Sequence, residues 1–260
     1  MEEETINIEL FKDPLGAWYK KLSPFFETEA GQKIYKFLKQ RNREKHKIFP
    51  LADSTFKAFT LTDPMDIKCV IVGMSPYHTV GKNGRPHADG LAFSSKLTKE
   101  EPPSLKLFND AIENDMGKKT MERQTDLSYL AKQGVLLINT SLTTELGKPT
   151  IHLDKGLWDD FNTFLFTKVL DTHCGIPFIL SGTHAHKLEK LLFSPMCHVI
   201  KKIEHPAFAA RQNREWNNDS CFAWANKILS QNINETIEWC YEDYMASIKP
   251  LEDIDDTPWD

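Results

Sequence analysis

Residues 68–78 read KCVIVGMSPYH, and this stretch decides how the chain folds. Cys69 to Val72 form a short apolar and mostly β-branched run, which is typical of a central strand covered on both faces. A glycine and a proline then end the strand, and Ser75, Tyr77 and His78 place three hydrogen-bonding side chains directly after it. Ligands of open α/β sheets bind at the carboxyl ends of strands, so the stretch predicts both a strand and a functional site.

Three further apolar runs of similar length follow, at residues 135–139, 176–180 and 197–203. Segments with helical spacing, long enough for crossover connections, separate these runs. Strands separated in this way form a parallel sheet. We therefore expect an α/β fold with a central four-stranded parallel sheet flanked by helices on both faces.

The rest of the chain is expected to belong to the same domain. Residues 16–46 carry aromatic and aliphatic side chains at helical spacing, which predicts two amphipathic helices packed on the body. A last helix is predicted over residues 219–231. Because no internal repeat or low-complexity linker interrupts the chain, we expect one domain over residues 1–246 and an acidic, disordered tail over residues 247–260.

Composition argues against several classes of protein. No run approaches the ~20 apolar residues that cross a bilayer, so no membrane association is expected. The 5 cysteines are scattered and never form CxxC, which favours a reducing compartment over a disulfide framework or a thiolate zinc site. The acidic start lacks the features of a signal peptide. We expect a monomeric cytoplasmic protein, or a nuclear one if the host is eukaryotic.

The net charge of -5 is concentrated at the two ends of the chain. Residues 1–10 hold four acidic residues and no basic one, and residues 251–260 hold five acidic residues and no basic one. Without these nine acids the body over residues 11–250 carries a charge of about +4. A weakly basic body permits a DNA-binding face.

Polar clusters follow all four predicted strands, at residues 73–78, 139–141, 181–184 and 204–208. The carboxyl ends of parallel strands lie at one edge of a sheet, so we expect the clusters to converge. They contain three histidines, but no HxH or HxxxH spacing joins these, and no metal or other cofactor is expected. Neither GxSxG nor GxxxxGK[ST] is present. Amide, imidazole and aromatic groups with Gly/Ser/Thr turns suit a planar heterocycle on a phosphodiester backbone.

The chain resembles family 1 uracil-DNA glycosylases in segments that occur in the same order. These segments are VGMSPYH at 72–78, GLAFS at 90–94, PPS at 102–104, GVLLINT at 134–140, SGTHA at 181–185 and HP at 205–206. The likeness runs from Trp18 to Trp239. It implies an enzyme that flips a pyrimidine nucleotide, uracil by default, out of DNA, hydrolyses the bond between base and sugar, and leaves an abasic site.

The resemblance also implies roles for individual residues in base recognition. Phe93 would stack on the flipped base, and the Asn139 amide would pair with the Watson–Crick edge of uracil. Tyr77 would press against the C5 edge and reject the methyl group of thymine. His205 would donate a hydrogen bond to the oxygen on which charge develops, a role best filled by neutral imidazole.

Contacts to the DNA backbone are implied for a second group of residues. Ser104, Thr183 and the backbone of Gly182 would hold phosphates. The family's His-Pro-Ser-Pro-Leu turn reads HPAFA here, at residues 205–209. Ala209 stands at the position of the leucine wedge, which is therefore absent, and Phe208 is the candidate to replace it.

The chain departs from the family at the position that activates water. The family's Gly-Gln-Asp-Pro-Tyr-His is replaced by a segment with Met74 and Ser75, which places Met74 beside the base. A serine hydroxyl cannot carry the charge of the aspartate, so transition-state stabilisation should fall by several kcal/mol unless another group compensates. Asp89 and His78 are the nearest candidates for a relocated base.

The loop over residues 79–89 is longer than the family's short turn and adds Lys82 and Arg85. Three functions therefore stay open: a working uracil-DNA glycosylase, a glycosylase retuned to a modified pyrimidine such as those of viral DNA (for example as a defence activity), and a catalytically weak DNA-binding relative. The pocket residues that are retained favour an enzyme. DNA is the expected partner, and a proteinaceous glycosylase inhibitor is a candidate second one.

Overall fold

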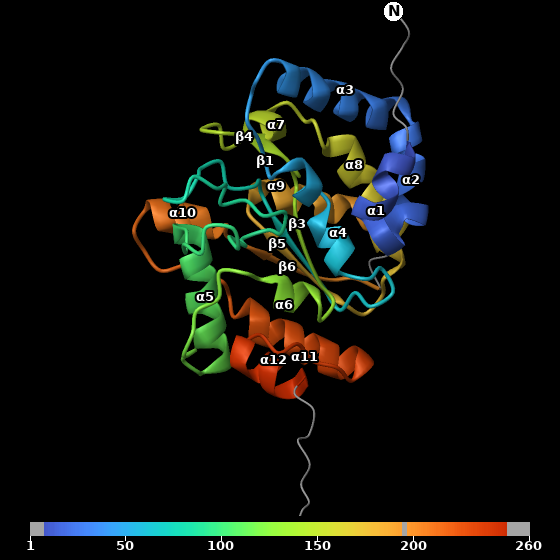
Figure 1. The fold of residues 1–260 in the computed structure, drawn as a ribbon. Helices are drawn as coiled ribbons and strands as arrows, with labels where there is room; N and C mark the ends of the chain where they lie inside the picture. The colour runs from blue at the N-terminus through green and yellow to red at the C-terminus, as the bar shows by residue number, and fades with distance from the viewer. Residues whose placement is uncertain (1–7, 194–196, 249–260) are drawn as a thin grey trace, which may run out of the picture.

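Four parallel strands form the centre of the computed structural model, which describes residues 8–193 and 197–248 (Figure 1). The strands are β2 (Cys69–Gly73), β3 (Val135–Asn139), β5 (Pro177–Ser181) and β6 (Val199–Ile203), in the order β3-β2-β5-β6. Every residue of β2 and β5, the two central strands, is buried. Helices lie on both faces of this sheet, so the predicted α/β architecture is confirmed.

The register of the strands brings their carboxyl ends to one edge. Gly73, the last residue of β2, pairs with Asn139, the last residue of β3. Ser181 at the end of β5 pairs with Ile203 at the end of β6. The polar clusters that follow the four strands therefore begin at the same edge of the sheet, as the sequence predicted.

The helices connect the strands and cover the sheet. They are α1 (Lys12–Leu15), α2 (Tyr19–Glu27), α3 (Glu29–Arg43), α4 (Lys57–Leu61), α5 (Pro103–Met116), α6 (Ser128–Ala131), α7 (Ile151–Asp154), α8 (Asp159–Phe164), α9 (Thr183–His186), α10 (Pro206–Arg211), α11 (Cys221–Ile233) and α12 (Tyr241–Ile248), with the shorter 3-10 or π turns η1 (Ile8–Phe11), η2 (Gly16–Trp18), η3 (Ala52–Ser54), η4 (Leu165–Val169), η5 (Leu170–Thr172) and η6 (Lys187–Leu191). Figure 1 shows α1–α4 and α8 on one side of the sheet, and α6, α11 and α12 on the other. No helix among the described residues is long and apolar enough to cross a membrane.

The two predicted N-terminal helices are α2 and α3, which meet at Thr28. The Thr28 hydroxyl caps α3 by accepting a hydrogen bond from the Gly31 N–H at 3.2 Å. Phe25 and Phe26 of α2 are buried, and the Phe25 ring packs edge-on against Phe161 of α8 at 5.3 Å between centroids. Both helices pack on the main core, since Phe25 and Phe26 of α2 and Ile34 of α3 are among its buried residues.

A small antiparallel sheet was not predicted from the sequence. Its strands, β1 (Ile48–Phe49) and β4 (Thr144–Glu145), are two residues long, too short to give a periodic pattern. The buried Glu145 carboxylate accepts hydrogen bonds from the Arg41 guanidinium at 2.7 and 3.0 Å. Chiefly because of these bonds, the pKa of Glu145 is lowered to about 2. The ion pair fastens the segment that follows β3 to α3.

The C-terminal part differs from the prediction in two ways. The predicted helix over residues 219–231 is α11, shifted by two residues, and it is followed by α12, which was not expected. Tyr241 of α12 packs edge-on against Tyr129 of α6 at 5.3 Å between ring centroids. The helix crosses the boundary predicted after residue 246, and the remainder of the predicted acidic tail lies outside the described residues.

Candidate functional site

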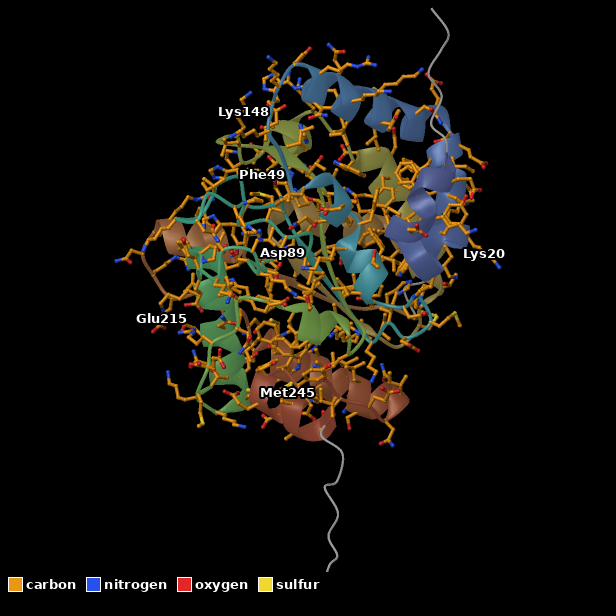
Figure 2. All side chains as sticks on the ribbon, viewed as in Figure 1. Lys20, Phe49, Asp89, Lys148, Glu215 and Met245 are labelled. Carbon is orange, nitrogen blue, oxygen red and sulfur yellow. The ribbon has the colours of Figure 1, made fainter. Side chains whose placement is uncertain are left out.

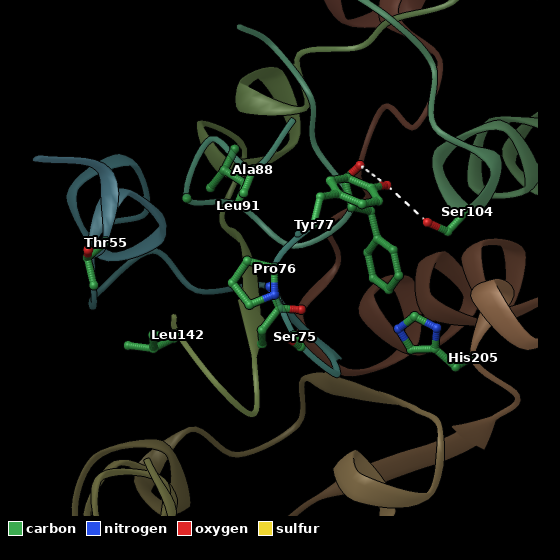
Figure 3. Close-up of a pocket in the computed structure, with 12 residues that line it drawn as sticks. Thr55, Ser75, Pro76, Tyr77, Ala88, Leu91, Ser104, Leu142 and His205 are labelled. Carbon is green, nitrogen blue, oxygen red and sulfur yellow. Dashed lines mark hydrogen bonds between the residues drawn. The ribbon is translucent and has the colours of Figure 1, made fainter. Parts of the chain in front are cut away.

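One pocket at the carboxyl edge of the sheet collects side chains from several strand ends and loops (Figure 3). Its lining residues are Thr55, Ser75, Pro76, Tyr77, Ala88, Gly90, Leu91, Phe93, Ser104, Asn139, Leu142 and His205. It encloses about 470 Å³ with its open mouth included. Six of the predicted site residues, far apart in sequence, therefore line one cavity.

Phe93 forms a wall of this pocket in a strained backbone conformation. Its φ angle is 68°, in the left-handed region that side chains other than glycine rarely adopt. Its ring stacks on Phe108 at 5.1 Å and lies 5.6 Å from the His205 ring, centroid to centroid. Strain of this kind persists only where surrounding contacts hold it, and here they hold an aromatic face against the cavity.

Tyr77 is held by hydrogen bonds on both sides of its phenol. Its hydroxyl donates to the Phe93 carbonyl at 2.9 Å and accepts from the Ser104 hydroxyl at 3.1 Å (Figure 3). Burial raises the pKa of the phenol well above its ordinary value, so the hydroxyl stays protonated. The ring is thus a fixed wall, and Ser104 positions it, a role that the sequence did not indicate.

Asn139 lies at the end of β3 directly against Gly73. A Cβ atom on Gly73 would lie 2.5 Å from Asn139 Oδ1 and 3.3 Å from Phe93 Cζ. Only a glycine at this position allows the amide and the Phe93 ring to approach so closely. The Asn139 side chain has no hydrogen-bond partner within residues 8–193 and 197–248, which leaves its donor and its acceptor for a ligand.

His205 follows β6 and caps α10. Its Nδ1 accepts a hydrogen bond from the Ala207 N–H at 3.1 Å, so the neutral ring carries its proton on Nε2. Burial, with a smaller contribution from the Arg211 cation, lowers the pKa of His205 to about 4. At neutral pH the pocket therefore contains an uncharged imidazole that offers an Nε2–H donor.

Ser75 lines the pocket, but its hydroxyl is already engaged with another loop. Ser75 Oγ donates to the Pro149 carbonyl at 2.6 Å. This bond connects the turn after β2 to the segment after β4. The Arg41–Glu145 ion pair holds β4, which precedes that segment, against α3. The oxygen of Ser75 keeps its lone pairs as acceptors.

Asp89 does not face the pocket, which corrects its predicted role as a relocated base. The residue is buried, with 1% of its surface exposed. Figure 2 labels it near the centre of the view. Its carboxylate accepts hydrogen bonds from Leu91 N–H at 3.1 Å, Ser94 Oγ at 2.7 Å and Lys96 N–H at 3.0 Å. The Lys57 ammonium lies 3.3 Å away. With its oxygens occupied in this way, Asp89 holds the loop that carries Phe93.

His78 also lies outside the set of pocket-lining residues. Its Nδ1 is buried and has no hydrogen-bond partner among the described residues. Burial lowers the pKa of the ring. Its predicted role as a relocated base therefore stays a prediction.

A groove adjoins the pocket and shares His205 with it. Its lining residues are Met74, Gly182, Thr183, His184, His186, Glu204, His205, Phe208 and Arg211. Met74 therefore lies in the groove beside the pocket, and its predicted contact with the base stays a prediction. Phe208 is 44% exposed, whereas Ala209 is fully buried, so Ala209 cannot contact DNA as predicted.

Some pocket residues carry no signal in the sequence. Thr55, Ala88 and Leu142 lie in connecting segments, and only the fold brings them to the cavity. Among the described residues, no three histidine, cysteine or acidic side chains are grouped so that they could hold a metal ion.

Known proteins that resemble the chain were sought by sequence and by structure. No model of a known protein family matches it. Curated uracil-DNA glycosylases do: the Acinetobacter baumannii protein is 30% identical over 223 residues, 86% of this chain and 91% of that protein. The Christiangramia forsetii protein is 32% identical over 86% of this chain and 97% of its own length. The Campylobacter lari protein is 36% identical over 74% of this chain and 80% of its own length.

Solved structures agree on the fold. The mimivirus uracil-DNA glycosylase superposes with a TM-score of 0.79 at 24% identity, over 91% of this chain and 90% of that chain. A mimivirus variant in complex with the inhibitor UGI superposes with a TM-score of 0.80 at 23% identity, over 91% and 92% of the two chains. At these identities the likeness concerns the architecture.

Proposed function

Since the chain belongs to the uracil-DNA glycosylase family, we propose that its pocket takes a uracil extruded from DNA and that hydrolysis of the N-glycosidic bond leaves an abasic site. The protein is a DNA N-glycosylase, a hydrolase of base excision repair. The observation that carries the proposal is that Tyr77, Phe93, Asn139 and His205 line one cavity. Together they provide a stacking face, a paired donor and acceptor, a steric limit and a donor for developing charge.

Recognition of uracil follows from the walls of the pocket. The Phe93 ring offers a face for stacking. The Asn139 amide presents one donor and one acceptor, which match the carbonyl and the N–H of uracil, while cytosine has the reverse pattern. A 5-methyl group would meet the Tyr77 ring, which the bonds to Phe93 and Ser104 keep from moving aside. Discrimination therefore depends on rigid groups that are already in position before the base arrives.

Departure of the base is assisted by His205. As the glycosidic bond breaks, negative charge collects on a carbonyl oxygen of the uracil ring. The Nε2–H of the neutral imidazole donates to that oxygen, and the bond from Ala207 N–H to Nδ1 keeps the ring in the required tautomer. A donor fixed in a buried site stabilises this charge more than water does.

Activation of water is the weakest part of the site. We propose that the attacking water donates a hydrogen bond to Ser75 Oγ, since the hydroxyl proton is directed to Pro149. A neutral oxygen provides less stabilisation for the cationic sugar than a carboxylate, so slower turnover than in relatives with aspartate is expected. We propose that His78 takes the proton from this water through a second, bridging water.

The groove next to the pocket is proposed to hold the DNA strand. Gly182, Thr183 and Met74 would follow the backbone, and the exposed ring of Phe208 would fill the gap left by the extruded nucleotide. We further propose that the protein acts as a monomer where DNA is found, in the cytoplasm, or in the nucleus of a eukaryotic host. A protein inhibitor that occupies the same face is a proposed second partner, supported by the mimivirus complex with UGI.

The test is direct. Oligonucleotides with a single uracil, thymine or 5-modified cytosine are incubated with the protein, and abasic sites are scored. We expect release of uracil, and its loss in the Asn139→Ala variant but not in Lys132→Ala, which changes an exposed residue at the opposite edge of the sheet. Release only of a modified base, or binding without release, would overturn the proposal.

A further inference from the structure

A hairpin inserted beside the pocket has no role in the mechanism described above. Residues 79–87, called the basic hairpin from here on, connect His78 to Ala88. Tyr77, directly before His78, and Ala88 both line the pocket. Val80 and Pro86 form an antiparallel bridge across it. The hairpin therefore projects from the rim of the cavity, at the end of the sheet where α10 also lies (Figure 1).

The tip of the basic hairpin is rigidly attached to a neighbouring turn. Lys82 N–H donates to Glu100 Oε1 at 2.7 Å, and the Asn83 amide donates to the Leu97 carbonyl at 2.9 Å. A Cβ on Gly81 would lie 2.7 Å from the Thr98 side chain, so the two segments pack with no space between them. Such contacts fix the direction of the tip before any ligand binds.

The base of the hairpin is linked to the tyrosine that limits the size of the bound base. The His87 ring packs edge-on against the Tyr77 ring at 6.2 Å between centroids. Its Nδ1 lies 3.0 Å from Thr79 Oγ1, and its Nε2 lies 3.4 Å from Glu100 Oε2. A displacement of the hairpin would therefore move the Tyr77 ring, which forms a wall of the pocket.

The tip of the basic hairpin carries two cations, Lys82 and Arg85. Lys82 and Arg85 are exposed, and within the described ranges neither side chain forms an ion pair or a hydrogen bond. Lys99 is exposed on the supporting turn and has no such partner there either. Glu100, the acid of this turn, already accepts hydrogen bonds from the hairpin, chiefly from the Lys82 N–H. The lowered pKa keeps this carboxylate ionised, but Lys82, Arg85 and Lys99 outnumber it, so the net charge of the tip and its supporting turn is positive.

The reach of the tip suits a phosphate close to the extruded nucleotide. Gly84 at the tip is four residues from Ala88 at the pocket, a span of at most about 13 Å at ~3.3 Å per extended residue. Successive phosphates of one strand are ~3.4 Å apart along the duplex axis. The two cations can thus meet phosphates within about four nucleotides of the base in the pocket.

We propose that the basic hairpin is a preformed clamp for the DNA backbone, in which Lys82 and Arg85 each neutralise one phosphate that flanks the extruded nucleotide. This inference rests on the proposed function, because the phosphates belong to the strand whose base enters the pocket. The clamp increases affinity for DNA without reading its sequence, since phosphates carry no sequence information.

The experiment measures how binding depends on salt. The probe is a duplex oligonucleotide with one 2′-fluoro-deoxyuridine, in which the electron-withdrawing fluorine slows bond cleavage, and affinity is measured from 50 to 200 mM salt. For two lost phosphate contacts, the slope of log affinity against log salt should become shallower by about 1.8 in the Lys82→Ala/Arg85→Ala variant. The ratio of the parent's affinity to that of the variant should then fall about tenfold between 50 and 200 mM salt.

Two matched variants separate a local contact from a general effect of charge. Lys82→Arg with Arg85→Lys keeps both charges and should keep the parent slope. Lys132→Ala/Lys227→Ala removes two exposed cations, Lys132 before β3 at the amino edge and Lys227 on α11, and should also keep it. Equal slopes for the parent and the hairpin alanine variant would overturn the clamp. Absence of uracil release by the parent would overturn the proposed function instead, because the slopes report binding alone.

Discussion

Lowering the pH should destabilise this protein through His205 over a defined range. The pKa of His205 is lowered from 6.5 to about 4 in the folded protein, mainly by burial. Between these two values the unfolded chain binds a proton at this residue and the folded chain does not. The free energy of unfolding must therefore fall as the pH is lowered from about 6.5, and this contribution levels off below about 4.

The size of the effect follows from the difference between the two pKa values. At about 1.4 kcal/mol per unit, the shift corresponds to roughly 3 kcal/mol of unfolding free energy between pH 7 and pH 4. Urea denaturation of the parent and of His205→Gln at pH 7, 5.5 and 4 measures this contribution. His78 and His152, whose pKa values burial also lowers, act in both proteins, so the difference isolates His205.

The rate of uracil release should also depend on the protonation state of His205. Protonation of Nδ1 breaks the hydrogen bond from Ala207 N–H and turns the ring away from its position. The single-turnover rate of uracil release should stay level down to about pH 5 and fall towards pH 4, and His205→Ala should reduce it at least ~10²-fold. A decline centred near 6.5, or equal pH dependence of unfolding in the parent and His205→Gln, would refute the assignment of a buried neutral imidazole.

Three other substitutions test separate parts of the site. Ser75→Asp should raise the single-turnover rate of uracil release by ~10-fold or more, since it restores a carboxylate beside the sugar; an unchanged or lower rate would contradict the view of this position. Gly73→Ala should lower the rate by ~10²-fold, because the added Cβ would lie 2.5 Å from Asn139 Oδ1 and displace the amide by about 1 Å. Gly73→Ala should cause little further loss in an Asn139→Ala background. If the losses of the two variants add, displacement of the Asn139 amide is not the cause. Glu145→Gln should lower the free energy of unfolding by ~3 kcal/mol at pH 7, because it removes the buried carboxylate that accepts two hydrogen bonds from the Arg41 guanidinium, although Arg41 keeps its ion pair with Glu44. Denaturant unfolding measures this loss. Since the pKa of Glu145 is about 2, the parent should lose the same contribution only as the pH falls from 4.5 to about 2.

The sequence by itself determined the sheet and the edge at which the site lies. The run from Cys69 to Gly73 is apolar and β-branched because both of its faces are buried, and such a run can be recognised without coordinates. The convergence of the polar clusters follows from the parallel arrangement alone. Asn139 and His205 could therefore be predicted to lie near each other although they are far apart in the chain.

Only the tertiary structure decided which of the candidate side chains are free to act. Asp89, Ser75 and Asn139 are all polar, but the side chains of the first two already have partners. The Ser75 hydroxyl donates to the Pro149 carbonyl in another loop, and the Asp89 carboxylate accepts from Ser94 in its own loop. Neither bond can be read from the local pattern of residues. The same holds for Ala209, which lies on the buried face of α10, a helix that the sequence did not predict. Hydrogen-bond satisfaction depends on contacts between segments distant in sequence, so spacing can nominate a polar residue but cannot show whether its atoms are already occupied.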